Sequence, residues 1–380
     1  MKLKKLILIV LAALLLFSLA ACAAEAPEET IGDAFGEHEE TIFSDVRIAF
    51  IHVGDITDLG YTYRQHRGTI DMMDALGIRE SQVLNFFNIM PGAAVGETIS
   101  QAVQWGADMI FGTSFAFEIH FVEAAERYPE IHFFHASGNQ ALGSGLPNLH
   151  NYFGNMAQAR YLSGIAAGLK TETNVLGFVA AFPFAEVISG FTAFYLGALA
   201  VNPDVTMYVK YTNVWNNPPL ETQVATTLID HGADVIGQHV DSPAAQIVAQ
   251  TRGVWSVGYN NDTIYIAPDS VLLSPMFDWS VYLIYAVDNF VRGNPSKQDF
   301  LAGLYEGMVL LSPLNPATAA PGTEEEIQQA KIYLLGGRNI FTGPLYDNVG
   351  NQILADGEEF IELQSAPTWA HIIEGITILQ

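Results

Sequence analysis

The sequence predicts an α/β protein built from two similar lobes that face each other across a ligand cleft. Short apolar strands alternate with helical segments from residue 46 to residue 257, the order typical of parallel sheets made of βαβ units. Residues 104–110 and 230–236 repeat one series of helix end, Gly-Ala-Asp and strand. The length of 380 residues, half of them hydrophobic, is sufficient for two domains.

Each half of this region supplies a set of strands and helices in alternation. Gly77 follows the first helical pattern and is expected to cap it. The predicted strands are 46–53, 83–87, 109–111 and 131–135 in the first half, and 175–180, 205–211, 234–236 and 255–257 in the second. The predicted helices are 62–76, 96–105, 117–127, 156–169, 186–200, 220–230 and 243–251.

The N-terminus has the features of a secretory signal. Three lysines precede an apolar run over residues 6–16, and Leu19-Ala20-Ala21-Cys22 follows. The apolar run is shorter than the roughly 20 residues that a membrane helix needs. We expect residues 1–21 to be a signal peptide and Cys22, the chain's one cysteine, to be the lipidated first residue of a mature lipoprotein. Residues 22–44, rich in Ala, Glu and Pro, are expected to form a flexible tether.

The rest of the chain divides by the same pattern. We expect an N-terminal α/β lobe at 45–155, to which part of the chain after 275 returns, and a C-terminal α/β lobe at 156–275. Residues 276–380 are expected to supply crossovers and closing elements. Ligands of open α/β sheets bind beyond the carboxyl ends of the strands. Two such lobes can therefore close around a solute by hinge motion.

The charge excludes several classes of partner. The formal net charge is −25, and without residues 1–21 it becomes −28, from 13 basic and 41 acidic side chains. This balance disfavours nucleic acid, whose binding depends on Lys and Arg contacts to phosphate, and disfavours anionic lipid surfaces. The expected contact with the membrane is the lipid anchor on the extracytoplasmic face alone.

Aromatic and polar side chains recur in the loops that follow the predicted strands. This combination suits a flat, polar, uncharged ligand such as a purine, because rings stack and amides or carboxylates bind the heteroatom edge. Single aromatics can equally be core residues, Asp58 and Thr62 can cap a helix, and Asp241 can cap the helix that follows Pro243. The candidate ligand-binding residues are Asp58, Tyr61, Thr62, Ser114, Phe115, Phe182, Phe184, Glu186, Trp215, Asn216, Asp241, Asn260 and Trp279.

No arrangement of residues points to catalysis or to a metal. The sequence has no Gly-x-Ser-x-Gly, no Walker loop and no Gly-x-Gly-x-x-Gly, and its histidines lack His-Glu-x-x-His spacing. We therefore predict neither an enzyme nor a cofactor or metal site.

The motifs that carry a family resemblance lie in these same loops and in the adjoining helices. They are Asp58 to Gly68, Thr113-Ser114-Phe115, Asn151 to Gly154, Gln158 to Gly164, Ala180 to Pro183, Gln238 to Pro243 and Gly258-Tyr259-Asn260. On this series, over residues 46–350, the chain resembles the BMP (basic membrane protein) family of ABC-importer substrate-binding lipoproteins, which includes purine-nucleoside receptors.

The resemblance implies a periplasmic-binding-protein-like type I fold, with two three-layer Rossmann-like lobes, and ABC permease and ATPase subunits as partners. It implies a purine between aromatics of the two lobes. Tyr61 stands where a Trp is usual, Phe182 or Phe184 would form the opposite face, and Trp215, Asn216 and Asp241 would contact the ligand. No lysine lies between residues 210 and 297 to match the charged pair that binds ribose. That absence favours a free base over a nucleoside.

Three alternatives remain open on the sequence. A binding protein of this fold can sense a ligand for a membrane regulator instead of delivering it to a permease. The solute can be a small molecule other than a purine. An extracellular nucleoside hydrolase would need a cluster of acidic metal ligands, which the sequence lacks.

Overall fold

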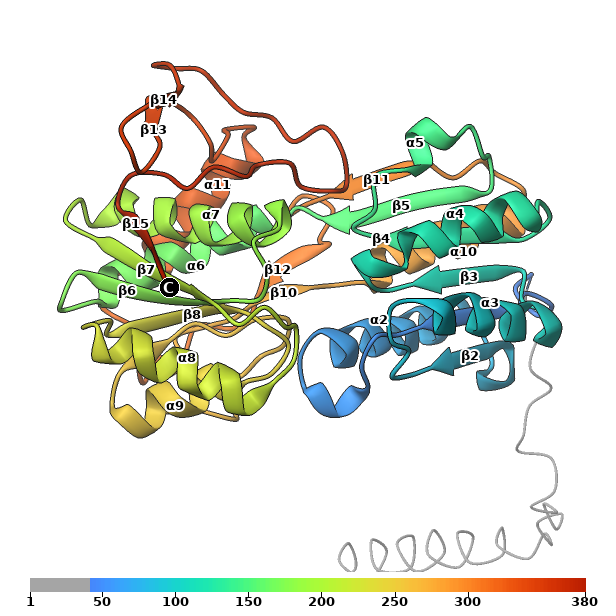
Figure 1. Cartoon of the computed structure of the whole chain (residues 1–380), viewed down its shortest axis with the longest axis horizontal. Helices are drawn as coiled ribbons and strands as arrows, with labels where there is room; N and C mark the ends of the chain where they lie inside the picture. The colour runs from blue at the N-terminus through green and yellow to red at the C-terminus, as the bar shows by residue number, and fades with distance from the viewer. Residues whose placement is uncertain (1–41) are drawn as a thin grey trace, which may run out of the picture. The chain divides into compact units, whose positions relative to one another are not determined.

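The computed structural model describes residues 42–380, in which two lobes each hold a parallel sheet between two layers of helices (Figure 1). The first lobe has six strands in the order β11-β5-β4-β3-β1-β2. These are β1 (Ile48–Ile51), β2 (Val83–Phe86), β3 (Met109–Gly112), β4 (His132–Ala136), β5 (Leu149–Gly154) and β11 (Asp299–Ala302). Helices α2 (Tyr61–Leu76) and α10 (Ser280–Arg292) cover one face, and α3 (Ala93–Trp105) and α4 (Glu118–Arg127) cover the other. Short helical turns complete the lobe: η1 (Ile56–Asp58), η2 (Glu80–Gln82), η3 (Phe115–Phe117) and α5 (Ala141–Ser144).

The second lobe has a five-stranded parallel sheet in the order β15-β7-β6-β8-β9. Its strands are β6 (Val175–Ala180), β7 (Thr206–Tyr211), β8 (Val235–His239), β9 (Trp255–Ser256) and β15 (Ile376–Leu379). One face packs against α6 (Met156–Lys170) and α7 (Ala185–Val201), and the other against α8 (Pro218–Asp230) and α9 (Ala244–Arg252). Helix α11 (Thr323–Leu335) packs against α6.

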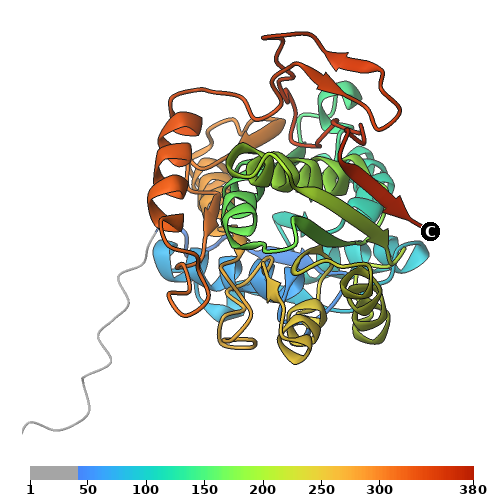
Figure 2. The ribbon, with the colours of Figure 1, turned by 90° about the vertical axis from the view of Figure 1, so that its left-hand side faces the viewer.

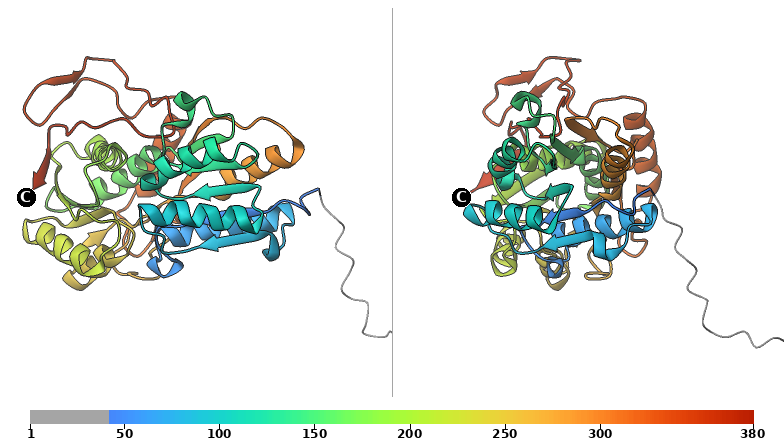
Figure 3. Two further views of the ribbon diagram at one scale, coloured as in Figure 1. Left: turned by 45° about the vertical axis from the view of Figure 1, so that its right-hand side comes forward. Right: turned by 90° about the vertical axis from the view of Figure 1, so that its right-hand side faces the viewer.

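Several crossings join the lobes. The antiparallel pair β10 (Pro275–Phe277) and β12 (Val309–Leu311) lies between them in Figure 1. The hairpin of β13 (Leu345–Tyr346) and β14 (Gln352–Leu354) precedes a long segment that ends in β15 at the edge of the second sheet (Figures 2 and 3). Within that segment, the backbone N–H and the hydroxyl of Ser365 donate to the carboxylate of Asp299 in β11. The C-terminal segment therefore contacts the first lobe before it completes the second.

The sequence explains these elements locally. All four residues of β1 are buried, as expected for a strand covered by helices on both faces. Gly77 ends α2 with a φ of 67°, the left-handed conformation that glycine adopts without strain. In the repeated Gly-Ala-Asp stretches, the carboxylate of Asp108 accepts the backbone N–H of Arg47, and that of Asp234 accepts those of Glu172 and Thr173. The repeat thus fixes the chain ahead of β1 in one lobe and ahead of β6 in the other.

Both lobes share one strand order, in which the first strand lies between the second and the third. The chain therefore moves from β1 to β2 on one side and returns to β3 on the other, and β6, β7 and β8 repeat this pattern. Such a reversal of strand order creates a crevice at the carboxyl edge of each sheet. The predicted periplasmic-binding-protein-like α/β fold is confirmed by solved structures of that type, which are reported below.

The differences from the predicted boundaries are local. Phe43 is buried in the first lobe's core, so the described end of the predicted tether belongs to that lobe. The predicted strand 46–53 ends at Ile51, and the residues after it turn toward the cleft. The elements after residue 275 were not predicted one by one. Residues 1–21 and Cys22 lie outside the described residues.

Candidate functional site

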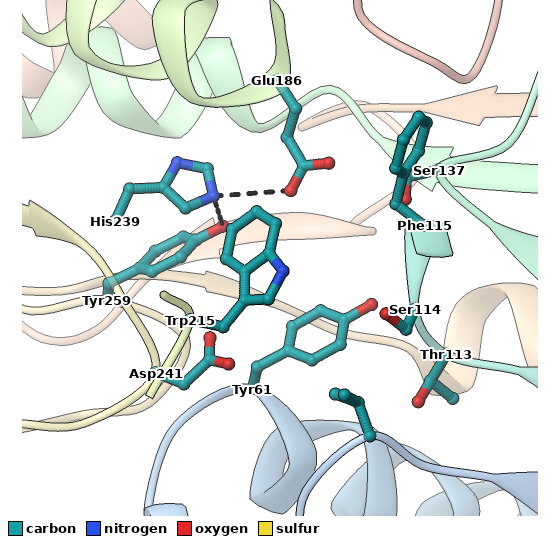
Figure 4. A pocket seen from close by; sticks show the side chains of 11 residues that line it. Tyr61, Thr113, Ser114, Phe115, Ser137, Glu186, Trp215, His239, Asp241 and Tyr259 are labelled. Atoms are coloured by element: carbon teal, nitrogen blue, oxygen red, sulfur yellow. Dashed lines mark hydrogen bonds and ion pairs between the residues drawn. The ribbon is translucent and has the colours of Figure 1, made fainter. Parts of the chain in front are cut away.

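A pocket lies where the carboxyl edges of the two sheets meet (Figure 4). It encloses about 380 Å³ of empty space, which includes its opening to solvent. Both lobes contribute to its wall. The lining residues are Val53, Tyr61, Thr113, Ser114, Phe115 and Ser137 from the first lobe, and Glu186, Trp215, His239, Asp241 and Tyr259 from the second.

Nearly every lining residue follows the end of a strand. In the first lobe, Val53 comes after β1, Thr113 to Phe115 after β3 and Ser137 after β4. In the second, Glu186 begins α7 after β6, and Trp215 comes after β7. His239 ends β8, Asp241 follows it, and Tyr259 comes after β9. The pocket therefore occupies the position at which open α/β sheets bind ligands.

Tyr61 forms the aromatic wall of the first lobe. Its ring meets the ring of Trp279 edge to face at 5.9 Å between centroids, and Trp279 is fully buried. The Tyr61 hydroxyl accepts a hydrogen bond from the Gln65 amide at 3.1 Å. Burial raises the pKa of Tyr61 well above its usual value, so the phenol stays protonated and able to donate. These contacts fix the orientation of the ring toward the pocket.

Four aromatic rings line the mouth in series. Trp215 packs edge to face on Phe182 at 5.1 Å, and Phe182 stacks on Phe184 at 5.1 Å. Phe184, in turn, contacts Phe115 of the opposite lobe at 5.6 Å. Trp215 and Phe115 line the pocket itself. The two rings that meet between the lobes, Phe115 and Phe184, are each about 40% exposed. An apolar contact between lobes thus borders the entrance.

A buried polar group closes one side of the pocket. The Nε2 atom of His239 lies 3.2 Å from the hydroxyl of Tyr259 and 3.5 Å from a carboxylate oxygen of Glu186 (Figure 4). Burial lowers the pKa of His239, and the charge of Arg160 lowers it further, against the raising effect of Glu186. The imidazole is therefore neutral at neutral pH, since its ordinary pKa is about 6.5.

Arg160 supports this group from behind. Its side chain is fully buried, and its guanidinium carbon lies 3.8 Å from the centre of the Tyr259 ring. Burial lowers the pKa of Arg160 to about 10, so the guanidinium is still charged at neutral pH. This cation–π contact fixes the ring whose hydroxyl meets His239.

Four carboxylates gather near the pocket, but two are already occupied. Asp58 accepts the backbone N–H groups of Gly60, Thr62 and Tyr63, and so caps the start of α2. Glu221 accepts the backbone N–H of Asn217 and the hydroxyl of Ser242. Both therefore serve the fold.

Asp241 and Glu186 are the carboxylates that face the pocket. Asp241 is 8% exposed, and within residues 42–380 its carboxylate accepts no hydrogen bond and joins no ion pair. Burial raises its pKa well above the usual value, and the charges of Asp58, Glu221 and Glu186 add to the effect. Glu186 has His239 beside one of its oxygens. A buried acid without partners is costly, so Asp241 is poised for a ligand that supplies hydrogen-bond donors.

The structure brings six of the thirteen candidate residues into the pocket. These are Tyr61, Ser114, Phe115, Glu186, Trp215 and Asp241. Phe182 and Phe184 lie at the mouth and do not line the pocket. Which of these residues bind a ligand stays a prediction.

The other five candidates lie outside the pocket wall. Asp58 has the capping role that competed with ligand binding, and the backbone of Thr62 is one of its partners. Asn216 is exposed and is not part of the pocket wall. Trp279 is a core residue behind Tyr61. Asn260 is fully buried, and within residues 42–380 its amide atoms have no hydrogen-bond partner.

Five lining residues were not among the candidates: Val53, Thr113, Ser137, His239 and Tyr259. Three of them, Thr113, His239 and Tyr259, belong to the strand-end loops that the sequence singles out. Their position alone was the signal that could have found them. Ser137 also comes shortly after a predicted strand, 131–135, whereas Val53 falls inside the predicted strand 46–53 and carries no such signal.

A second cavity of about 420 Å³ adjoins the pocket and shares Glu186 and His239 with it. Its other walls include Phe153, Asn155 and Ser189, together with Phe341 and Glu362 of the C-terminal region. The His239–Glu186 pair therefore stands between two spaces.

Residues 42–380 contain neither a cluster of metal-ligating side chains nor a membrane-spanning helix. No set of three or more His, Cys, Asp or Glu side chains in this range is arranged to hold a metal ion. Over the same range, no helix has both the length and the apolar character needed to cross a membrane.

Comparison with known proteins identifies relatives across most of the chain. Residues 45–338 match the model of the Bmp family, described as PnrA-like ABC transporter substrate-binding proteins. A purine-binding protein of Brucella abortus is 32% identical over 315 residues, which cover 83% of this chain and 88% of that protein. A protein of Haloferax volcanii, provisionally named as an ABC transporter glucose-binding protein, is 31% identical over 298 residues, which cover 77% of this chain and 74% of that protein.

Solved structures share the fold at low sequence identity. An ABC transporter solute-binding protein from Aeropyrum pernix superposes with a TM-score of 0.65 at 19% identity, over 77% of this chain and 92% of that chain. One from Conexibacter woesei gives a TM-score of 0.62 at 17% identity, over 77% and 97% of the two chains. At these identities the likeness establishes the two-lobed fold and nothing more.

Proposed function

Since the chain belongs to the Bmp family of ABC transporter substrate-binding proteins, we propose that it binds a purine base between its lobes and delivers it to a membrane importer. The family is one of extracytoplasmic solute-binding proteins, not of enzymes. The partners are then a permease and an ATPase. The purine-binding relative, at 32% identity over most of both chains, supports this choice of ligand.

One observation supports the ligand class above the others. The pocket combines aromatic rings from both lobes, Tyr61 and Trp215, with the unpartnered carboxylate of Asp241. A planar heterocycle matches this combination, because its faces stack on the rings while its N–H groups meet the carboxylate. No Lys or Arg is among the eleven lining residues, which disfavours phosphorylated or otherwise anionic ligands.

The membrane attachment belongs to the same proposal. Lipid on Cys22 would hold the receptor beside its importer, and the acidic residues 23–44 would connect it to the lobes. Stable anchoring by this route needs two or more acyl chains, since one chain gives marginal binding.

Calorimetric titration of the purified protein tests the ligand. The panel contains adenine, guanine, hypoxanthine, adenosine, guanosine and glucose. We expect one-to-one binding of a purine base with a Kd of about 1 µM or lower, equivalent to about −8 kcal/mol. Absence of heat with every purine would overturn the ligand assignment and leave the family membership intact.

A sugar is the second candidate ligand. The Haloferax relative's provisional name points to glucose, and carboxylates beside aromatic rings also accept hydroxyl donors. In the same titration, binding of glucose without binding of purines would favour this candidate.

A further inference from the structure

The hydrogen-bonding groups of the pocket are divided between the lobes. The first lobe contributes the hydroxyls of Tyr61, Ser114 and Ser137, which can donate or accept. The second lobe contributes the carboxylates of Glu186 and Asp241, which accept only when ionised, beside the side chains of Trp215, His239 and Tyr259. Of those three, His239 and Tyr259 already lie within hydrogen-bond distance of each other. Figure 4 shows both carboxylates on the side of the pocket formed by the second lobe. A ligand that pairs with these carboxylates must therefore present N–H or O–H donors to them.

The protein itself supplies few donors for these carboxylates. His239 approaches one oxygen of Glu186 at 3.5 Å, and Asp241 has no partner within residues 42–380. The neighbouring acids Asp58 and Glu221 differ, because backbone N–H groups and a hydroxyl already satisfy them. Of these four acids, Asp241 and Glu186 are therefore the two whose carboxylate oxygens can still accept hydrogen bonds from a ligand in the pocket.

We infer that the site selects purines that carry an exocyclic amino group, with Asp241 and Glu186 as the acceptors that recognise its N–H donors. This inference rests on the proposed function and names the ligand class within it. An amino group adds two donors to the ring edge. Replacing it by hydrogen removes them and leaves a buried carboxylate without a partner, which costs binding free energy.

Two matched pairs of bases isolate the amino group. Adenine differs from unsubstituted purine by its amino group alone, and guanine differs from hypoxanthine in the same way. We expect the amino base to bind about 10-fold to 100-fold more tightly in at least one pair, the range for a hydrogen bond to a charged group. Calorimetric titration of the wild-type protein with all four bases gives the ratios.

The variants Asp241→Asn and Glu186→Gln test which side chains cause the preference. Each keeps the size of the side chain while replacing one acceptor oxygen by a donor NH2 group. We expect at least one of them to reduce the preference within the discriminating pair about 10-fold. Asp269→Asn is the control, because this substitution makes the same change in charge as Asp241→Asn. Asp269 is exposed and is not part of the pocket wall.

The outcomes separate this inference from the proposed function. Equal affinity within both pairs, or a preference that survives both substitutions, would overturn the inference while purine binding stands. Failure of all four bases to bind would overturn the proposed function and the inference together. A preference that is lost in the Asp241 or Glu186 variant and retained in the Asp269 variant would support it.

Discussion

Tyr61 lines the pocket from the first lobe and Asp241 from the second, and their surroundings differ. Trp279 and Gln65 fix the ring of Tyr61, whereas nothing within residues 42–380 satisfies the carboxylate of Asp241. The ring of Tyr61 is thus held in place by its neighbours, whereas the carboxylate of Asp241 lacks hydrogen-bond donors until a ligand supplies them. Their substitutions should therefore differ in their effects on stability.

Replacing Tyr61 tests the stacking wall. We expect Tyr61→Ala to weaken purine binding by about 1–3 kcal/mol, the usual contribution of a base stacked on an aromatic ring. Tyr61→Phe keeps the ring and should lose much less. Calorimetric titration of both variants with a purine measures the loss of binding free energy. Equal losses in Tyr61→Ala and Tyr61→Phe would show that the hydroxyl contributes to binding and that the ring does not.

Replacing Asp241 tests the cost of its burial. An acid whose pKa is raised in the folded state favours folding at low pH, and this contribution is lost as the pH rises above its unfolded pKa of about 3.9. At neutral pH the wild-type protein therefore bears the cost of a buried, unpartnered carboxylate. Asp241→Asn should raise the Tm of the ligand-free protein at pH 7.5 by about 2 °C or more.

The pH dependence provides the control for that prediction. Below pH 4 both proteins carry a neutral side chain at position 241, so the difference in Tm should disappear. Thermal unfolding at several pH values measures it. A Tm advantage that persists unchanged at low pH would point to packing instead of charge.

Sequence reasoning located the pocket but not all of its residues. Position after a strand correctly singled out Tyr61, Trp215 and Asp241 as residues of the pocket wall. It could not separate Trp279 from them, because a core aromatic and a ligand-facing aromatic have the same local sequence. Only the packing of α10 on α2 shows that Trp279 lies behind Tyr61.

At the scale of elements, the loop ahead of α2 meets the loops after β8 and β9 across the cleft. The amide of Asn261 donates to the carbonyl of Leu59 at 3.4 Å. A Cβ atom added to Gly60 would lie 2.0 Å from the carbonyl oxygen of Asp241, far inside van der Waals contact. The two lobes can approach this closely because residue 60 is glycine.

Gly60→Ala should therefore hinder closure of the lobes. Because apparent affinity falls in proportion to the closed fraction, we expect the Kd for a purine to rise about tenfold or more. Calorimetry gives the affinity, and small-angle X-ray scattering should show a smaller ligand-induced contraction than in the wild type.

Gly96→Ala serves as the matched control. Its added Cβ would have no neighbour nearer than 3.9 Å, and the residue lies within α3, away from the pocket wall. Affinity should stay unchanged in this variant. Unaltered affinity in Gly60→Ala as well would contradict the role given to the contact between the loops.

Most regular elements up to residue 257 follow from sequence because strands such as β1 are apolar throughout and helices such as α2 end at a capping glycine. Strand β5 (Leu149–Gly154) is an exception that the sequence analysis did not predict. The C-terminal region is different. There β11 and β15 join sheets whose other strands lie far away in the chain, and Ser365 pairs with Asp299 across 66 residues. Such long-range pairing leaves no periodic signal in the local sequence.

At the scale of the whole molecule, the two lobes follow Cys22 and an acidic stretch, residues 23–44, in the sequence. The surplus of acidic residues disfavours binding to anionic lipid, so the proposed attachment to the membrane rests on Cys22. We expect Cys22→Ser to move the protein from the membrane fraction to the soluble extracytoplasmic fraction. Immunoblotting of the two fractions measures this, and retention of the variant at the membrane would contradict lipid anchoring.

Crystallisation of the protein with adenine tests the central claim most directly. The predicted result is density for the base between Tyr61 and Trp215, with an N–H group of the base within hydrogen-bond distance of Asp241 or Glu186. An empty pocket at saturating adenine, or a base bound elsewhere on the molecule, would contradict it.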